Sequence, residues 1–397
     1  MQAVILVGGL GARLGTLTKK MPKPMMDIGG KPFLELIINN LKRFGIKNIL
    51  LLVGYRCHDI IDYFQDGSRW NVIIRYSIER EPAGTGGALL LASDKLEDEF
   101  LLLNGDTFFD FNILDLLVRV PHGKWEFKVA LTPSKSSERY GSIIINNENR
   151  VTSFVEKRTH LKSALINSGI YHVRKSILKY IDSIPCSLEN HVLPKIVSNE
   201  QMYGYIYNGY FVDIGIPCDL ERGRMDLPDR KRPAAFLDRD GVINYDKGYV
   251  HKKEDFNWMQ GAIEAIKYLN DIGYYVIVIT NQAGVARGYY TEEQLNAFHL
   301  WINEQLIEQG GHIDKFYYCP HHPTEGIGPY RIICDCRKPS SGLIIKAMEE
   351  FNIDKKTSFL LGDKDTDIIA GKEAQINSFL FTGHNLLDEI ILILNRL

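Results

Sequence analysis

Short apolar runs alternate with segments of helical periodicity along the first part of the chain. Each run has the length of a buried strand, and the segment after it places apolar residues three and four positions apart. The runs and the helical segments that follow them are, in order, 3–9 and 32–45, 48–54 and 58–67, and 100–106 and 112–120. This alternation is typical of a parallel sheet with helices on its faces. We therefore predict a Rossmann-like α/β sheet whose reactive loops lie at the carboxyl ends of its strands.

From about residue 125 the pattern becomes one of short strands without helices between them. Four such runs are KVALTP, GSIIINN, VTSFVEK and SGIYHV, at 128–133, 141–147, 151–157 and 168–173. Short strands in close succession favour antiparallel pairing. We expect them to extend the parallel sheet into a mixed one.

A charged segment with two prolines separates this region from a second α/β pattern. The segment reads ERGRMDLPDRKRPA, and a new apolar strand, AAFLD, begins at its end. Such a composition favours a linker between domains. We predict a first domain at residues 1–222, a linker at 223–233 and a second domain at 234–397.

The second domain repeats the alternation on a smaller scale. Its strand-like runs lie at 234–238, 274–281, 315–320, 358–363 and 378–383, and its helical segments at 262–273, 291–306 and 341–352. The terminal segment 385–397 has the pattern of an amphipathic helix that packs on the domain. We predict a smaller, separate α/β domain here.

Composition agrees with two domains, because 397 residues exceed what one hydrophobic core usually supports. With 45% hydrophobic and 24% charged residues and a net charge of −2, the chain has no overall field that attracts nucleic acid or a membrane. The N-terminus MQAVILVGG lacks the basic flank of a signal peptide, and no apolar run reaches roughly 18 residues. We expect a cytoplasmic protein without nucleic-acid or membrane partners. Its oligomeric state stays open, with a homo-oligomer as one option.

A glycine-rich loop follows the first strand. Gly8, Gly9 and Gly11 lack side chains, so their backbone N–H groups can approach a phosphate, and Arg13 and Lys23 can neutralise its charge. Any turn between a strand and a helix can hold glycines, so this loop alone does not settle a function. It is neither a Walker loop nor a GxGxxG fingerprint, because the lysine arrives a dozen residues later between prolines.

The extended pattern GGLGARLGTLTKKMPKPM closely resembles the sugar-phosphate nucleotidyltransferases, which join a nucleoside triphosphate to a sugar 1-phosphate. Further matches follow in the same order over roughly residues 1–222: EPAGTGGAL, LLLNGDTFFD, VEK, NSGIY and FVDIGIP. The attack of one polyanion on another requires cations that neutralise charge and hold the groups in line. Alone, Asp106 at a strand end is as typical of a helix cap as of a metal ligand, and Glu156 beside Lys157 is usually a surface pair.

The resemblance implies a role for each residue of these motifs. Lys23 holds the phosphates of the triphosphate, and Gly86 and Gly87 lie close to the base. Asp106 and Asp213 share Mg²⁺. Glu156 and Lys157 contact the sugar phosphate, and Asn167 contacts the sugar hydroxyls.

The stretch FLDRDGVIN carries a second candidate site. Asp238 and Asp240 lie two positions apart after an apolar strand, so they point the same way if the strand continues. That arrangement suits one nucleophile and one acid/base group. A turn or a fragment of a Ca²⁺ loop has similar letters, but no EF-hand run follows.

Three later motifs, VITNQAGVARG, CRKPSSG and FLLGDKDTD, complete a resemblance to the haloacid dehalogenase superfamily of phosphatases, without a large cap insertion. The resemblance implies that Asp238 attacks phosphorus and that Asp240 protonates the leaving alkoxide and then activates water. Thr280 and Lys338 bind the phosphoryl oxygens. Asp363 holds Mg²⁺ with Asp238 and the backbone carbonyl of Asp240, and Asp367 supports the metal through Lys364 or water.

Three of the six cysteines crowd into a short loop beside histidines. Cys319, His321, Cys334 and Cys336 form a C-x-H…C-x-C set that suits a closed, structural Zn²⁺ site, with His322 as the alternative histidine. Free cysteines in a reducing cytosol are the other interpretation. The loop ends next to Arg337, which we expect to contact substrate.

The second domain resembles the heptose bisphosphate phosphatases in five motifs: Asp-Arg-Asp-Gly, TNQAGVARG, CPHHP, CDCRKP and GDK. Histidinol phosphatases share much of this pattern. The first domain most resembles the heptose 1-phosphate guanylyltransferases. A phosphatase that leaves a sugar 1-phosphate, fused to a transferase that consumes one, favours heptose over histidinol.

The implied substrates are D-glycero-α-D-manno-heptose 1,7-bisphosphate, heptose 1-phosphate and GTP. The products are phosphate, pyrophosphate and GDP-D-glycero-α-D-manno-heptose. This nucleotide sugar supplies heptose for lipopolysaccharide or other surface glycans. Two alternatives remain at this stage. One is another nucleotide or hexose 1-phosphate with a histidinol-phosphatase-like partner, and the other is a regulatory or scaffold role for one half.

Overall fold

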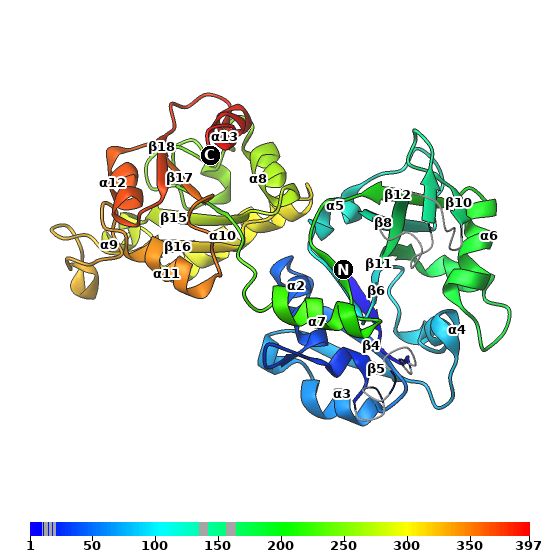
Figure 1. Ribbon diagram of the computed structural model, residues 1–397. Coiled ribbons are helices and arrows are strands. Elements are labelled where there is room, and N and C mark those ends of the chain that lie inside the picture. The colour runs from blue at the N-terminus through cyan, green and yellow to red at the C-terminus, as the bar shows by residue number, and fades with distance from the viewer. Residues whose placement is uncertain (10, 12–14, 16–17, 19–20, 135–141, 156–163) are drawn as a thin grey trace. The chain divides into compact units, whose positions relative to one another are not determined.

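The computed structural model describes residues 1–9, 11, 15, 18, 21–134, 142–155 and 164–397. The chain forms two compact units, Met1–Pro228 and Asp229–Leu397 (Figure 1). Each has its own sheet and its own buried core. The units are therefore described one at a time.

The N-terminal unit is built on a mixed nine-stranded sheet. Its central path runs in the order β10-β9-β11-β6-β1-β4-β5, and β8 joins β11 to β12. The strands are β1 (Gln2–Leu6), β4 (Asn48–Val53), β5 (Ile73–Ile78), β6 (Glu99–Asn104), β8 (Phe127–Ser134), β9 (Ser142–Ile145), β10 (Val151–Val155), β11 (Ala164–Arg174) and β12 (Met202–Ile206).

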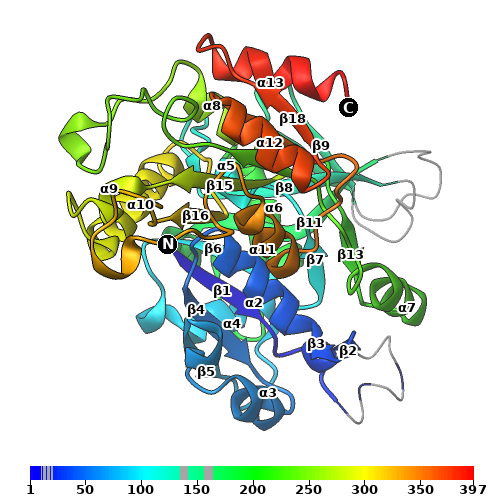
Figure 2. The same ribbon diagram turned by 90° about the vertical axis from the view of Figure 1, so that its left-hand side faces the viewer.

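Most of the parallel pairing in this sheet joins the strands that alternate with helices, as the sequence predicts. β1 pairs in parallel with both β4 and β6, and β4 with β5 (Figure 2). β11 then pairs antiparallel with β6 and β8, which confirms the expected mixed sheet. β12 is the exception, since it returns parallel to β8.

The helices of this unit are α2 (Phe33–Arg43), α3 (Cys57–Phe64), α4 (Gly84–Leu91), α5 (Ile113–Val118), α6 (Leu193–Ser198) and α7 (Pro217–Asp226). Two short ribbons complete it: β2 (Asp27–Ile28) with β3 (Lys31–Pro32), and β7 (Thr107–Phe109) with β13 (Phe211–Asp213). Val4, Leu50 and Leu102 point to the same face of the sheet and share a core with α4. The ribbon β7–β13 matters for function because it lies directly after β6.

Part of the segment expected as a linker is helical. α7 continues through Asp226, and the charged residues that suggested a linker form ion pairs on its surface, such as Arg224 with Glu221 at 2.6 Å. Gly223 is buried on the opposite side. The charged composition that suggested a linker therefore belongs in part to the solvent-facing side of a helix. The domain bounds 1–222 and 234–397 stay a prediction.

The C-terminal unit has a five-stranded, fully parallel sheet in the order β16-β15-β14-β17-β18. The strands are β14 (Ala234–Leu237), β15 (Tyr275–Asn281), β16 (Lys315–Cys319), β17 (Phe359–Gly362) and β18 (Asn377–Leu380). The helices are α8 (Ala262–Asp271), α9 (Ala283–Ala286), α10 (Glu292–Ile307), α11 (Gly342–Glu350), α12 (Asp365–Glu373) and α13 (Leu386–Leu394). This agrees with the predicted Rossmannoid domain.

Successive residues of β14 enter different cores. Leu237 packs in the core that α8, α10 and α13 share, and Phe236 packs in the core formed with α11 and α12. Both faces of the sheet are thus covered by helices, which explains why its strands are continuous apolar runs. Side chains with polar chemistry can then leave the sheet only at its strand ends.

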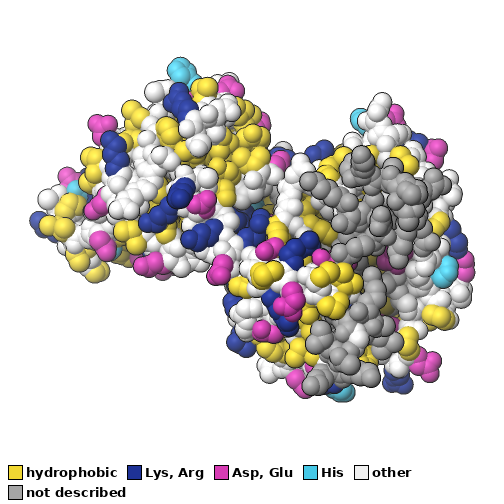
Figure 3. Space-filling model, in the orientation of Figure 1, with side chains coloured by type: hydrophobic (Ala, Val, Ile, Leu, Met, Phe, Trp, Pro, Cys, Tyr) yellow, Lys and Arg dark blue, Asp and Glu magenta, His cyan; other side chains and the backbone are white. Residues whose placement is uncertain are grey.

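The surface agrees with the near-neutral composition. Basic and acidic side chains are interspersed on the face shown in Figure 3. Among the helices that the structure describes, none combines the length and apolar character needed to cross a membrane.

Neighbouring isoleucines on α11 test which side of this helix is buried. Ile344 is fully buried, whereas Ile345 is 45% exposed. We expect Ile344→Ala to lower the free energy of unfolding by about 2–5 kcal/mol, since it leaves a cavity, and Ile345→Ala by less than about 1 kcal/mol. Denaturant titrations of both variants measure the difference. Equal losses would contradict the packing of α11.

Candidate active sites

A cavity of about 560 Å³ lies at the carboxyl ends of the parallel strands in the N-terminal unit. Its lining includes five residues that the sequence singled out: Gly8, Gly9, Gly11, Lys23 and Asp106. Lys23 and Asp106 are 83 positions apart in the sequence, and the fold brings them into contact beside the glycine loop. The predicted phosphate-binding elements therefore share one cavity.

Lys23 and Asp106 form an ion pair in this cavity. The Lys23 Nζ lies 3.0 Å from the Asp106 Oδ2, and Lys23 is only 8% exposed. The prolines around Lys23 place it in a short 3₁₀ turn, Lys23–Met25, that is itself buried. An ammonium group held this way is fixed in position before any phosphate binds.

The ribbon β7–β13 brings Asp213 next to Asp106. Asp213 pairs with Thr107, and the N–H of Ile214 donates to the carbonyl of Asp106 at 2.9 Å. Asp213 also accepts a hydrogen bond from the N–H of Gly215 at 2.7 Å. Two carboxylates on adjacent backbone segments are a donor set that a hard divalent cation prefers.

Gly105 allows this arrangement because no side chain fits at its position. A Cβ there would lie 2.7 Å from the carbonyl oxygen of Leu6 and 2.5 Å from Val7. The N–H of Gly105 donates to that same carbonyl at 2.9 Å. β6 can therefore stay against β1 up to the residue before Asp106.

Other predicted residues of this unit lie elsewhere or are not described. Gly84, Thr85 and Ala88 of α4 line the cavity, whereas the N–H groups of Gly86 and Gly87 both donate to the Cys186 carbonyl, at 2.9 and 3.2 Å. A helix turns sequence neighbours to different sides, so the two glycines face the protein instead of the cavity. Arg13, Glu156 and Lys157 lie outside the described residues.

Asn167 uses its amide within β11. Its Nδ2 donates to the Tyr171 hydroxyl at 2.6 Å, and its Oδ1 accepts from the N–H of Gly169 at 2.9 Å. It is not part of the cavity lining. Its contact with a sugar stays a prediction.

Two acidic residues of the cavity wall, Glu79 and Glu189, were missed by sequence reasoning. The Glu189 Oε2 accepts hydrogen bonds from the hydroxyls of Thr85 at 2.9 Å and Ser187 at 3.1 Å. Thr85 and Glu189 are 104 positions apart, and no motif near Glu189 points to this contact. Only the fold reveals that this carboxylate faces the same cavity as Lys23.

The second site lies at the carboxyl ends of β14, β15 and β17. The Lys338 Nζ lies 2.9 Å from the Asp238 Oδ1 and 2.6 Å from the Asp367 Oδ1, and it donates to the Ile279 carbonyl at 2.8 Å. Burial raises the pKa of Asp238 to about 6, although Lys338 acts against this shift. Burial also opposes the charge of Lys338, but the two carboxylates raise its pKa above the ordinary value. The lysine and the aspartates that the sequence singled out thus lie together, and their catalytic roles stay a prediction.

Asp363 completes an acidic cluster. Ligand oxygens of Asp238, Asp363 and Asp367 all lie within 4.8 Å of one another. The Asp363 Oδ1 is buried without a hydrogen-bond partner among the described residues, and burial raises its pKa. Gly241, with φ of 94°, lets the loop after Asp240 pass against Asp363. Three carboxylates against the buried Lys338 and the exposed Lys364, whose Nζ lies 3.5 Å from the Asp363 Oδ2, leave a net negative charge, which a divalent cation would offset.

Asp367 makes direct contacts instead of acting only through Lys364. It binds Lys338 through Oδ1, and its Oδ2 accepts from the backbone N–H of Lys364 at 3.0 Å. The second contact caps the start of α12. Asp367 therefore fixes both Lys338 and the turn that carries Asp363.

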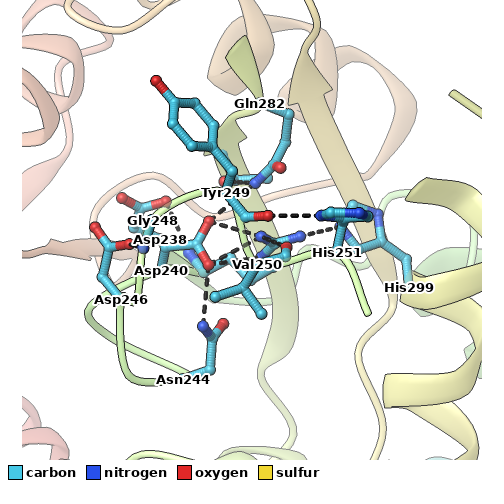
Figure 4. Close-up of polar contacts among 12 residues, drawn as sticks. Asp238, Asp240, Asn244, Asp246, Gly248, Tyr249, Val250, His251, Gln282 and His299 are labelled. Carbon is cyan, nitrogen blue, oxygen red and sulfur yellow. Dashed lines mark hydrogen bonds and ion pairs between the residues drawn. The ribbon is translucent and has the colours of Figure 1, made fainter. Parts of the chain in front are cut away.

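Asp240 is surrounded by hydrogen-bond donors (Figure 4). Asn244 Nδ2 donates to Oδ1 and Gln282 Nε2 donates to Oδ2, both at 3.0 Å. Gln282 also donates to the hydroxyl of Thr280 at 2.8 Å and accepts from the Tyr290 hydroxyl at 2.6 Å. Asn244 and Gln282 lie within motifs that the sequence singled out, but their contacts with Asp240 were not predicted.

The cysteine and histidine cluster forms as expected. Sγ atoms of Cys319, Cys334 and Cys336 lie 3.2–3.6 Å apart, and the His321 Nδ1 lies 3.3 Å from the Cys336 Sγ. These distances are close to the edges of about 3.8 Å that follow from Zn–S bonds of about 2.3 Å. Burial raises the pKa of Cys319 to about 11, and a bound cation would reverse that shift by stabilising the thiolate. The chemistry of the donor set therefore fits a soft divalent metal.

The two residues beside the cluster have other contacts. His322 Nδ1 accepts from the N–H of Glu325 at 3.0 Å and does not belong to the cluster, so His321 is the histidine that faces the cysteines. Arg337 NH1 donates to the His321 carbonyl at 3.2 Å. Its contact with substrate stays a prediction.

Comparison with known families divides the chain in the same way. Residues 2–230 match the model of the nucleotidyl transferase family, and residues 234–378 match that of polynucleotide kinase 3 phosphatase. Among curated relatives, a D-glycero-alpha-D-manno-heptose 1-phosphate guanylyltransferase of Aneurinibacillus thermoaerophilus is 40% identical over 57% of this chain and 98% of its own length. A D-glycero-beta-D-manno-heptose-1,7-bisphosphate 7-phosphatase of Pasteurella multocida (strain Pm70) is 48% identical over 37% of this chain and 79% of its own length.

A solved structure supports the first match. HddC from Yersinia pseudotuberculosis, crystallised with GMP-PN, superposes with a TM-score of 0.51 at 33% identity. The superposition covers 56% of this chain and 97% of that protein.

Glycines 105 and 9 allow a matched test of the loop packing. Gly105→Ala places a methyl group against backbone, whereas at Gly9 a Cβ meets none of the described residues within 4 Å. We expect Gly105→Ala to lower stability by about 1–3 kcal/mol, because β6 must move from β1, and Gly9→Ala to leave it unchanged. Thermal unfolding without nucleotide measures both. A stable Gly105→Ala protein would contradict the close approach before Asp106.

Proposed function

The chain belongs to the nucleotidyl transferase family and, in its C-terminal part, to the phosphatase family of its relatives. From this premise we propose that it makes a nucleotide heptose in two steps. It removes the 7-phosphate of D-glycero-α-D-manno-heptose 1,7-bisphosphate. It then transfers GMP from GTP to the heptose 1-phosphate, which gives GDP-D-glycero-α-D-manno-heptose and pyrophosphate. One observation carries the proposal: a single chain spans most of a heptose bisphosphate 7-phosphatase and nearly all of a heptose 1-phosphate guanylyltransferase, and a reaction of the first kind leaves a sugar 1-phosphate, the class of substrate that the second uses.

We assign the anomer of the bisphosphate from the position at which the phosphatase acts. The phosphatase relatives are named for the beta bisphosphate, and the transferase relative for the alpha 1-phosphate. Removal of a phosphate at C7 leaves C1 unchanged, so both steps of one chain must use the same anomer. We assign the alpha form, because only that form continues to the transferase.

The phosphatase reaction uses the groups around Asp238. Both Lys338 and the N–H of Arg239, at 2.7 Å, bind the Asp238 Oδ1, so we assign the attack on phosphorus to Oδ2. The bond between phosphorus and the sugar oxygen breaks, and Asp240 gives that oxygen a proton. Asp240 then takes a proton from water, whose oxygen attacks phosphorus and frees the Asp238 carboxylate and phosphate. Thr280 and Lys338 bind phosphoryl oxygens.

Mg²⁺ is the cation that we propose at both sites. Asp238, Asp363 and the backbone carbonyl of Asp240 would hold it in the phosphatase, and Asp106 and Asp213 in the transferase. Bound there, it would neutralise phosphate charge. We propose Zn²⁺ for Cys319, His321, Cys334 and Cys336, as a structural ion that fixes the loop before Lys338.

The transferase reaction depends on positioning. A phosphate oxygen of the sugar attacks the α-phosphorus of GTP, and the electron pair of the broken bond leaves with pyrophosphate. We assign the glycine loop of Gly8, Gly9 and Gly11, with Arg13, to the triphosphate. Lys23 then exchanges its contact with Asp106 for the phosphates. Glu156, Lys157 and Asn167 are proposed to contact the sugar phosphate.

Two matched substitutions separate the reactions. We expect Asp238→Asn to lower phosphate release by about 10³-fold or more and to leave nucleotidyl transfer intact. Asp106→Asn should lower transfer by at least about 10²-fold and spare phosphate release. Phosphorus NMR follows both steps in tubes that hold Mg²⁺, either anomer of the bisphosphate and one of GTP, ATP, CTP, UTP or dTTP.

Several results of that experiment would contradict the proposal. A nucleotide sugar formed with a base other than guanine would change the assigned substrate, and cleavage of the beta anomer alone would separate the two steps. Preferred cleavage of histidinol phosphate or a 3′-phosphorylated oligonucleotide would reassign the phosphatase. Loss of both activities in either variant would contradict independent sites.

The metal cluster gives a prediction about neighbouring histidines. Purified protein should hold about one zinc ion per chain by elemental analysis. His321→Ala should lower the zinc content and destabilise the loop, because it removes a ligand, whereas His322→Ala should retain the ion. Full zinc occupancy in His321→Ala, or loss in His322→Ala, would show that the cluster binds metal differently.

A further inference from the structure

An arginine between the two catalytic aspartates reaches the second of them. Arg239 NH2 lies 2.9 Å from the Asp240 Oδ1 and 2.7 Å from its Oδ2, and Nε lies 3.2 Å from Oδ1. Asn244 and Gln282 each add one hydrogen bond (Figure 4). Asp240 is therefore held from three segments of the chain, and Arg239 is the charged donor among them.

Arg239 is completely buried, with an exposed fraction of 0%. Besides Asp240, its guanidinium donates to the Val250 carbonyl at 2.6 Å and lies 5.4 Å from the centre of the Phe298 ring. A buried cation is costly unless its donors are paired. Lys338, and not the side chain of Arg239, contacts the nucleophile Asp238. The contacts of Arg239 thus serve Asp240 and the loop that carries Val250.

His299 on α10 holds the far end of this guanidinium. Arg239 NH1 lies 3.2 Å from the His299 Nε2, and the imidazole stacks on Phe316 with ring centres 4.4 Å apart. Burial, and the nearby Arg239, lower the pKa of His299 well below its ordinary value, so the ring is neutral and Nε2 accepts a hydrogen bond. Because His299 is neutral, it gives Arg239 a hydrogen bond but no opposite charge. The charged partner of Arg239 is therefore the Asp240 carboxylate.

We infer that Arg239 is a positioning residue for Asp240, which it holds in place for proton transfer to the departing sugar oxygen, and that His299 fixes Arg239. A carboxyl group that carries a proton still accepts hydrogen bonds at its other oxygen. Because Arg239 reaches both oxygens, it can hold Asp240 before and after the proton moves. The inference rests on the proposed phosphatase function.

Proton transfer from Asp240 matters more for some leaving groups than for others. A sugar alkoxide is a poor leaving group and needs the proton as the bond to phosphorus breaks. A p-nitrophenolate ion is stable without a proton, so it depends little on the acid. A displaced Asp240 should therefore slow cleavage of the sugar phosphate selectively, whereas general damage to the fold should slow both substrates alike.

The experiment compares kcat/KM for heptose 1,7-bisphosphate and p-nitrophenyl phosphate in Arg239→Lys. This ratio reports the steps up to departure of the leaving group. We expect a loss of about 10- to 100-fold with the sugar phosphate and a loss of less than about threefold with the aryl phosphate. Arg232→Lys makes the same change at another buried arginine, which lies over the Tyr275 ring, and should leave both values unchanged.

His299→Phe keeps a ring beside Phe316 and removes the acceptor of Arg239. It should show a smaller loss in the same direction, and it decides the question if Arg239→Lys does not fold. Equal losses with both substrates, or no loss in either folded variant, would overturn the role of Arg239. A wild-type protein that releases no phosphate from the sugar bisphosphate would overturn the proposed function instead.

Discussion

A parallel sheet covered by helices on both faces leaves its reactive side chains one exit, at the carboxyl ends of the strands. The C-terminal unit obeys that constraint, and the parallel strands within the mixed sheet of the N-terminal unit also present their reactive loops at these ends. In the first, the loop after β1 and the turn after β6 bring Gly8 and Asp106 to one cavity. In the second, Asp238 follows β14, Thr280 lies at the end of β15 and Asp363 follows β17. Residues far apart in sequence meet because their strands are neighbours in register, and the chemistry depends on this pairing.

Charge balance then determines what each site can bind. The phosphatase cluster sets three carboxylates against the buried Lys338 and the exposed Lys364, so it is short of positive charge before any phosphate enters. In the transferase cavity Asp106 is held against Lys23. A cation that joins either site offsets the protein's carboxylates and then the substrate's phosphates. The same deficit appears in another form at Cys319, where burial disfavours the thiolate until a metal is bound.

The sequence predicted the features that depend on local pattern. Apolar runs with helical segments after them identified the parallel strands, and spacing alone identified Cys319, His321, Cys334 and Cys336. Features that depend on distant contacts were not predictable. Charged residues on the solvent side of α7 had the composition of a linker, and the N–H groups of Gly86 and Gly87, on α4, donate to the distant Cys186 carbonyl. Glu189 and His299 carry no motif, because each gains its role from a residue at least 60 positions away.

The Asp-Arg-Asp order shows how the second site separates two tasks over three residues. In the proposed mechanism the first carboxylate attacks phosphorus, and it is held by Lys338, which also contacts Asp367 and the Ile279 carbonyl. The second carboxylate exchanges a proton in that mechanism, and it is surrounded by donors that reach both oxygens. One cation for both tasks would tie the position of the acid/base group to that of the nucleophile. With Lys338 on one and Arg239 on the other, Asp240 can lose and regain a proton while the contacts of Asp238 stay unchanged.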